Sequence, residues 1–86
     1  MKYELEYSKE LRKFLTKHSD ISGRILEKLE TLALNPYENS LDIKPLKDSP
    51  NHYRLRVGKY RILYEIIDEC ILIYAYRADS RGDVYK

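Results

Sequence analysis

The amino-acid sequence predicts an α+β fold: an N-terminal strand, a hairpin of two helices, and then an antiparallel sheet of three to four strands. Three patterns support this prediction. Apolar residues alternate over residues 3–7, recur at helical spacing between residues 11 and 33, and form nearly continuous short runs after residue 60. The chain has 86 residues, of which 43% are hydrophobic, so we expect residues 1–86 to form a single small domain.

The N-terminal strand and the first helix follow directly on one another. Residues 3–7 alternate between apolar and charged side chains, which is the pattern of a half-buried strand. Ser8 is suited to cap a helix whose apolar residues lie on one face and which ends near His18 and Ser19.

A second helix is expected from about residue 20 to residue 34. Ser19 or Asp20 is suited to cap it, and Asn35-Pro36 should end it. Residues 36–50 contain all three prolines and are expected to form an irregular connection. Three apolar residues should hold this connection to the core: Leu41, Ile43 and Leu46.

Three strands are expected in the second half of the chain, over residues 52–57, 60–67 and 71–76. Gly58-Lys59 should form the turn between the first two, and Asp68-Glu69 the turn before the third. The second and third strands are almost entirely apolar, which indicates that they lie in the interior of the sheet. The helices should pack together on one sheet face, and residues from 77 onward are expected to be a polar tail.

Positive charge is concentrated in the hairpin that the strands over residues 52–57 and 60–67 should form. Arg54, Arg56, Lys59 and Arg61 fall within eight residues, and no acidic residue lies among them. An alternating strand places Arg54 and Arg56 on one face, where two guanidinium groups are well suited to bind phosphate. The formal net charge is +2, but residues 44–86 carry nine Lys and Arg against six Asp and Glu. The expected ligand is therefore a polyanion, and RNA is the leading candidate.

Several other kinds of site find no support in the sequence. It has no glycine-rich phosphate loop, and its one cysteine and two histidines have unrelated spacings, so we expect no metal and no cofactor. The single cysteine, Cys70, excludes an internal disulfide and is expected to be a small buried residue. His18 and His52 are expected to be ordinary surface or helix-end residues. No segment resembles a signal peptide or a membrane span, so a cytoplasmic location without membrane contact is expected.

Seven residues remain as candidates for chemistry on RNA: Arg54, Arg56, Lys59, Arg61, Arg77, Arg81 and Tyr85. RNA carries its own nucleophile, the 2′-hydroxyl. A protein can therefore promote cleavage by aligning that group, stabilising charge on the phosphate and protonating the leaving oxygen. Arginine can stabilise the charge, and tyrosine can stack on a base or transfer a proton. Tyr85 is notable because it lies in the polar tail, whereas the tyrosines of the strands are expected to pack.

Three stretches of the sequence resemble the RelE/ParE toxin superfamily: Leu46-Lys47, the block from Tyr53 to Ile67, and the ending from Arg81 to Lys86. Together with the order of the elements, the resemblance covers essentially the whole chain. It implies a RelE-like microbial RNase fold and a toxin neutralised by a RelB-like antitoxin. RelE-like members cut mRNA in the ribosomal decoding site through the 2′-hydroxyl, whereas ParE-like members inhibit DNA gyrase.

The resemblance also implies roles for individual residues. The positions of catalytic residues fall on Arg61, Arg81 and Tyr85. The family's basic pair, which is expected to bind RNA, falls on Arg54 and Arg56. Lys59 and Arg77 are expected to bind RNA beside this pair because of their charge. The family's C-terminal arginine falls best on Arg81, and Arg77 is the alternative position for it. Some members have lysine where Arg54 and Arg56 stand, and arginine does not readily lose its proton. The role of general base would therefore fall on Tyr85 or on another group.

These expectations lead to one leading function and two alternatives. The chain is expected to be a ribosome-dependent endoribonuclease toxin that works on mRNA and binds a cognate antitoxin. Operator DNA would be bound only through the antitoxin complex. The first alternative is a gyrase inhibitor without nuclease activity. The second is a binding member that has lost catalysis, which arginine in place of lysine and the tail acids Asp79 and Asp83 would support.

Overall fold

The structure, a computed structural model, describes residues 2–80. Two helices and five strands follow in the order β1 Glu4–Tyr7, α1 Lys9–Lys17, α2 Ser19–Leu34, β2 Ile43–Pro45, β3 His52–Val57, β4 Tyr60–Ile67 and β5 Leu72–Ser80. A single 3-10 turn, Asp68–Cys70, joins β4 to β5.

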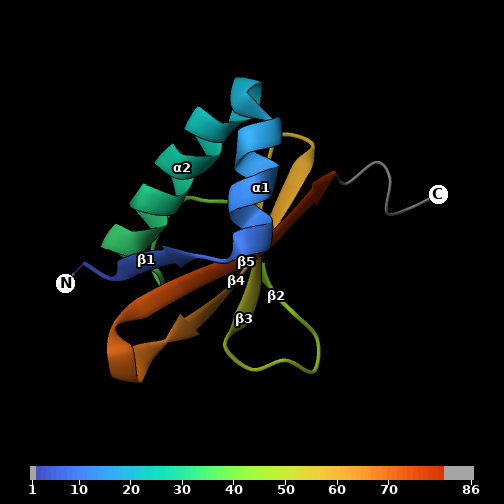
Figure 1. Cartoon of the computed structure of the whole chain (residues 1–86). Coiled ribbons are helices and arrows are strands. Elements are labelled where there is room, and N and C mark those ends of the chain that lie inside the picture. The colour runs from blue at the N-terminus through green and yellow to red at the C-terminus, as the bar shows by residue number, and fades with distance from the viewer. Residues whose placement is uncertain (1, 81–86) are drawn as a thin grey trace.

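The five strands form one sheet in the order β1-β5-β4-β3-β2. All neighbouring strands are antiparallel except β1, which pairs with β5 in parallel. Both helices lie on the same side of this sheet, and the opposite side has no helix over it in the described part of the chain (Figure 1). The α+β class, the helical hairpin and the interior position of β4 and β5 are as predicted. Four strands follow the helices, which is the upper end of the three to four expected, and β1 joins the same sheet. The parallel pairing of β1 with β5 was not foreseen.

The hydrophobic core fills the space between the helices and the sheet. Its fully buried large side chains include Leu11 and Leu29 from the helices and Leu55, Ile62 and Ile73 from the sheet. The buried residues of α2 recur at helical spacing, and those of β3 and β4 lie at every second position, which is why the predicted faces are the buried ones.

The helix ends show one prediction confirmed and one wrong. The Ser8 hydroxyl caps α1 by accepting a hydrogen bond from the Leu11 backbone N–H at 3.0 Å. Neither Ser19 nor Asp20 caps α2, because Ser19 is already helical and His18 is the residue between the helices. The His18 N–H donates to the last turn of α1, while its carbonyl accepts from the first turn of α2. The N-cap residue of α2 is therefore His18, whose side chain makes no capping hydrogen bond and instead lies 3.0 Å from the Phe14 carbonyl.

Two strand boundaries differ from the prediction. The connection over residues 36–50 contains β2, a short edge strand that ends at Pro45. Proline has no N–H to donate, so its presence argues against a strand here in the sequence. An edge strand nevertheless tolerates it. Leu41 and Ile43 pack against the core, as expected, whereas Leu46 does not belong to the core cluster or to the residues packed against it. In addition, β5 does not stop at residue 76 but continues to Ser80.

The continuation of β5 to Ser80 arises from a bulge in this strand. Leu63 pairs with Arg77 and Tyr64 pairs with Ala75, so Tyr76 is the extra residue between them. The bulge breaks the alternation of apolar and polar residues, which made the last four residues of the strand resemble a tail. Cys70 was also predicted wrongly. It is exposed, because it lies in the 3-10 turn rather than in a strand.

Candidate nucleic-acid interface

The face of the sheet away from the helices carries the predicted arginine pair. Leu55 and Val57 of β3 are buried against the helices, so Arg54 and Arg56 project from the opposite face. We call this opposite face, formed by the outward-pointing residues of β3, β4 and β5, the open face. The shared orientation of Arg54 and Arg56 is as predicted.

The strand register brings two further arginines to the open face. Arg56 is opposite Arg61 on β4, and Arg61 is opposite Asp79 on β5. One step along the strands, Arg54 is opposite Leu63, and Leu63 is opposite Arg77. Three strands therefore contribute arginines to two neighbouring rows, and the bulge at Tyr76 is what turns Arg77 toward them.

Acidic residues from elsewhere in the fold accompany these arginines. Arg56 Nε lies 2.9 Å from Asp42 Oδ2, and an Arg61 terminal nitrogen lies 3.5 Å from Asp79 Oδ1. Arg77 Nε is 3.9 Å from Asp79 and 4.0 Å from Glu10. No acid lies between residues 54 and 61 in sequence, but in the folded interface acids lie beside three of the four arginines. Its local charge is consequently lower than the sequence indicated.

The arginines differ in how accessible they are. The Arg61 side chain is 13% exposed, so neighbouring side chains of the sheet cover most of it. Arg77 is far more exposed, and its two ion pairs are at the limit of contact distance. Arg54 forms no ion pair with any residue between 2 and 80, and its neighbour on β2 is another cation, Lys44. Arg54 is therefore well placed to receive an anion from solution.

Lys59 does not join this group. It lies in the turn between β3 and β4, and its ammonium sits 5.6 Å from the centre of the Tyr60 ring. Tyr60 in turn packs edge-on against Phe14 and His18, on the helical side of the sheet. The remaining predicted site residues, Arg81 and Tyr85, lie outside the described residues.

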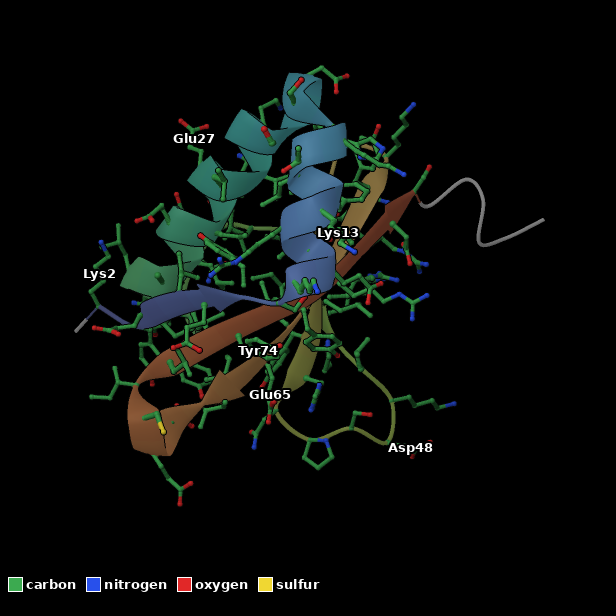
Figure 2. The ribbon with its side chains drawn as sticks, viewed as in Figure 1. Lys2, Lys13, Glu27, Asp48, Glu65 and Tyr74 are labelled. Atoms are coloured by element: carbon green, nitrogen blue, oxygen red, sulfur yellow. The ribbon has the colours of Figure 1, made fainter. Side chains whose placement is uncertain are left out.

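One cluster on the open face was not predicted from the sequence. His52 Nδ1 lies 3.0 Å from the Tyr76 hydroxyl, and His52 Nε2 lies 3.8 Å from Glu65 Oε2. Tyr74 stacks on Tyr76 with ring centres 6.1 Å apart. Figure 2 shows Glu65 and Tyr74 on the side of the sheet away from the helices. Burial and the Glu65 carboxylate raise the pKa of the Tyr76 phenol, while Arg77 opposes them, so the phenol is a hydrogen-bond donor at neutral pH.

Part of this cluster could have been found from the sequence. Counting outward from the two-residue turn pairs His52 with Glu65 directly. The position of Tyr76 could not have been found in this way, because it depends on the bulge. The other histidine, His18, has the structural role that was expected: it stacks on Phe14 at the helix junction, with ring centres 4.0 Å apart.

The interface is a surface rather than a pocket. A cavity of about 680 Å³ lies beside α1, where Lys13 and Phe14 line it together with Ala78 of β5. No arginine of the open face lines this cavity. Among residues 2–80, no three His, Cys, Asp or Glu side chains gather closely enough to hold a metal ion. Neither α1 nor α2 is long and apolar enough to cross a membrane. An exposed surface with dispersed cations suits a polymeric anion better than a small molecule.

Comparisons with known proteins agree with this fold. The family model of the ParE toxin of the type II toxin–antitoxin system parDE matches residues 5–85. The RelE1 protein of Methanocaldococcus jannaschii is 34% identical, over 100% of this chain and 98% of its own length.

Two solved toxin–antitoxin complexes contain similar chains. The RelB–RelE complex from Methanococcus jannaschii has a chain that is 33% identical with a TM-score of 0.73, covering 93% of this chain and 94% of that one. The RelBE2 complex from Mycobacterium tuberculosis has a chain that is 27% identical with a TM-score of 0.78, covering 94% of this chain and 100% of that one. The family match and these similarities extend over nearly the whole chain, so the protein belongs to the RelE/ParE superfamily of toxins from type II toxin–antitoxin systems.

Proposed function

We propose that this toxin is an endoribonuclease that cleaves mRNA in the decoding site of the ribosome and thereby stops translation. The observation that carries the proposal is the gathering of Arg54, Arg56, Arg61 and Arg77 from three strands on one open face. A phosphodiester laid on this face would meet guanidinium groups from both sides of Leu63. Such groups stabilise the extra negative charge that develops on phosphate during 2′-hydroxyl attack.

The mixture of cations and acids supports dependence on the ribosome. Asp42, Asp79 and Glu10 neutralise part of the arginine charge, which weakens the attraction for free RNA. The ribosome would supply the alignment of substrate that the toxin lacks, since precise positioning can provide a large share of the rate. We expect activity on free RNA to be weak.

We also propose a RelB-like antitoxin as the physiological partner, with operator DNA bound through the toxin–antitoxin complex in the cytoplasm. The similar chains from Methanococcus jannaschii and Mycobacterium tuberculosis were solved as toxin–antitoxin complexes. Purification of the tagged toxin from cells that express the neighbouring reading frame tests this, because a cognate antitoxin would be recovered in stoichiometric amount.

Cleavage is tested by primer extension on a defined mRNA bound to ribosomes, with wild type, Arg54→Ala and Arg24→Ala compared. New ends should appear in the decoding site with wild type. Arg54→Ala should reduce cleavage about tenfold to a hundredfold, the effect of losing a hydrogen bond to a charged group. Arg24 is an exposed arginine of α2 on the helical side, so its substitution is the matched control and should leave the rate unchanged.

A second candidate follows from the family model, which is that of a ParE toxin. ParE-like activity would be inhibition of DNA gyrase without cleavage of RNA. Intact mRNA after incubation with folded wild-type protein would contradict the endoribonuclease proposal. Inhibition of supercoiling by gyrase in the same preparation would then establish the alternative.

A further inference from the structure

We propose that His52 and Tyr76, with the Glu65 carboxylate beside them, form the proton-transfer pair of this site: His52 is the general base and Tyr76 the general acid. This inference rests on the proposed endoribonuclease function and deepens it. It assigns chemistry to residues of β3, β4 and β5 that lie within the described fold.

The arrangement has the geometry of an acid–base relay. The hydroxyl of Tyr76 lies at hydrogen-bond distance, 3.0 Å, from His52 Nδ1. The Glu65 carboxylate is 3.8 Å from the other ring nitrogen, Nε2, which is close enough to stabilise a protonated imidazole but too far for a hydrogen bond. In the tautomer that carries its proton on Nδ1 and donates it to the Tyr76 oxygen, Nε2 has a lone pair that can accept a proton from a substrate. A carboxylate, an imidazole and a hydroxyl in this order are the parts from which many proton-transfer sites are built.

The relay lies beside the arginines that would hold the phosphate. His52 and Arg54 are two residues apart on β3, which is about 6.6 Å along a strand. Tyr76 immediately precedes Arg77, and the bulge places both on the open face. A phosphate bound over Leu63, between Arg54 and Arg77, would thus lie next to the His52 imidazole and the Tyr76 phenol.

The chemistry requires such a pair, because arginine is a poor proton carrier. The 2′-oxygen of RNA attacks phosphorus, so an O2′–P bond forms while the P–O5′ bond breaks. The 2′ proton goes to His52 Nε2, and the Tyr76 hydroxyl proton goes to the departing 5′-oxygen. The imidazolium then returns its Nδ1 proton to the Tyr76 oxygen. The products are a 2′,3′-cyclic phosphate and a 5′-hydroxyl, and both side chains are neutral again. The imidazole now carries its proton on Nε2, and exchange through water returns it to Nδ1 for the next cycle.

The first test measures single-turnover cleavage on programmed ribosomes with wild type, His52→Ala and His52→Gln. Each variant should lose on the order of 10²- to 10³-fold in rate, as expected for the loss of a general base. Added imidazole should restore part of the activity of His52→Ala, because the small base can enter the space left by the side chain. His52→Gln fills that space and should not be rescued. A structural role for His52 predicts a loss that imidazole does not repair.

The second test separates the acid from the base by changing the leaving group. An mRNA with sulfur in place of the bridging 5′-oxygen has a leaving group that needs no protonation. Tyr76→Phe should be slow on normal mRNA but close to wild type on this substrate, whereas His52→Ala should stay slow on both. Tyr74→Phe removes the hydroxyl of the neighbouring stacked ring and should be unaffected throughout.

The outcomes distinguish this inference from the function on which it rests. If wild type cleaves mRNA and depends on Arg54, but His52→Ala cleaves at the wild-type rate, the relay is wrong and the proposed function stands. The relay is also wrong if Tyr76→Phe is equally slow on both substrates. If folded wild type leaves mRNA intact, the proposed function and the relay fail together.

Discussion

At the scale of single residues, Asp68 holds three parts of the chain together. Its carboxylate accepts hydrogen bonds from the hydroxyls of Tyr3 at 2.7 Å and Tyr37 at 2.8 Å. These donors come from the start of the chain and from the connection after α2, while Asp68 itself lies in the turn before β5. The bond from Tyr3, and then that from Tyr37, lower the pKa of Asp68 below its ordinary value of 3.8.

We predict that Asp68→Asn destabilises the fold at neutral pH and that this difference fades in acid. A carboxyl group whose pKa is lower in the folded state contributes stability that is present above the unfolded pKa. This stability is lost as the pH falls through the folded pKa. Urea unfolding at pH 7 and near pH 3 measures the change. Glu69→Gln is the control, because Glu69 is adjacent and exposed and forms no ion pair within residues 2–80. Equal curves for both variants at pH 7 would contradict this role for Asp68.

Tyr64 illustrates the opposite case, a buried polar atom that stabilises nothing. Its ring is fully buried between the sheet and the helices, and its hydroxyl has no hydrogen-bond partner among residues 2–80. Burial raises the pKa of this phenol, so it stays protonated. Tyr64→Phe should leave the free energy of unfolding unchanged or raise it by up to about 1 kcal/mol, because it removes an unpaired polar group and keeps the ring. A loss of more than about 1 kcal/mol in urea unfolding would show that the hydroxyl is hydrogen-bonded in solution.

At the scale of elements, the turn between β3 and β4 sets the register of the arginine rows. Val57 pairs with Tyr60, so Gly58 and Lys59 are the two loop residues, and Gly58 has a positive φ of 61°. A positive φ at the first loop position belongs to the hairpin turns whose twist matches that of the strands. A Cβ at Gly58 would meet no atom within 4 Å, so the cost of substitution is conformational alone.

Gly58→Ala should therefore lower the free energy of unfolding by about 1–2 kcal/mol, the cost of a left-handed conformation for an ordinary residue. Gly58→Asn should lose less, since asparagine tolerates this region. Denaturant unfolding of the three proteins measures the order glycine, asparagine, alanine. Equal stability of all three would mean that the turn changes its conformation to accept a side chain.

The same hairpin shows how far the sequence could predict the fold. The alternation in β3, the short turn and the apolar β4 were local signals, and they correctly placed Arg54 and Arg56 on one face. The continuation of β5, the turning of Arg77 and the His52–Tyr76 contact all depend on a bulge, which leaves no periodic pattern to detect. The ion pair between Arg56 and Asp42 joins residues 14 positions apart through an edge strand that contains a proline. Such contacts follow from packing and not from local propensity.

At the scale of the whole molecule, acids lie beside three of the four arginines of the open face, so the charge does not form an uninterrupted positive patch. The net charge of +2 and the acids beside Arg56, Arg61 and Arg77 keep the field of the open face weak. This balance makes the affinity for RNA depend on which individual acids are present. Removing an acid that pairs with an interface arginine should therefore matter more than removing one elsewhere.

Asp42→Asn tests this dependence, with Asp48→Asn as the matched control. Both substitutions raise the net charge by one, but Asp42 lies 2.9 Å from Arg56, whereas Asp48 is exposed in the loop after β2 and forms no ion pair within the described chain. Asp48 has a positive φ of 62°, which asparagine also accepts, so the control should fold normally.

Asp42→Asn should strengthen binding to a single-stranded RNA about twofold to fivefold, matching the ~0.5–1 kcal/mol of an exposed ion pair. The slope of the logarithm of the binding constant against the logarithm of the salt concentration should also become steeper by about 0.7, because Arg56 becomes available to one phosphate. Fluorescence anisotropy over a series of KCl concentrations measures both quantities, and equal changes in the two variants would show that net charge alone governs binding.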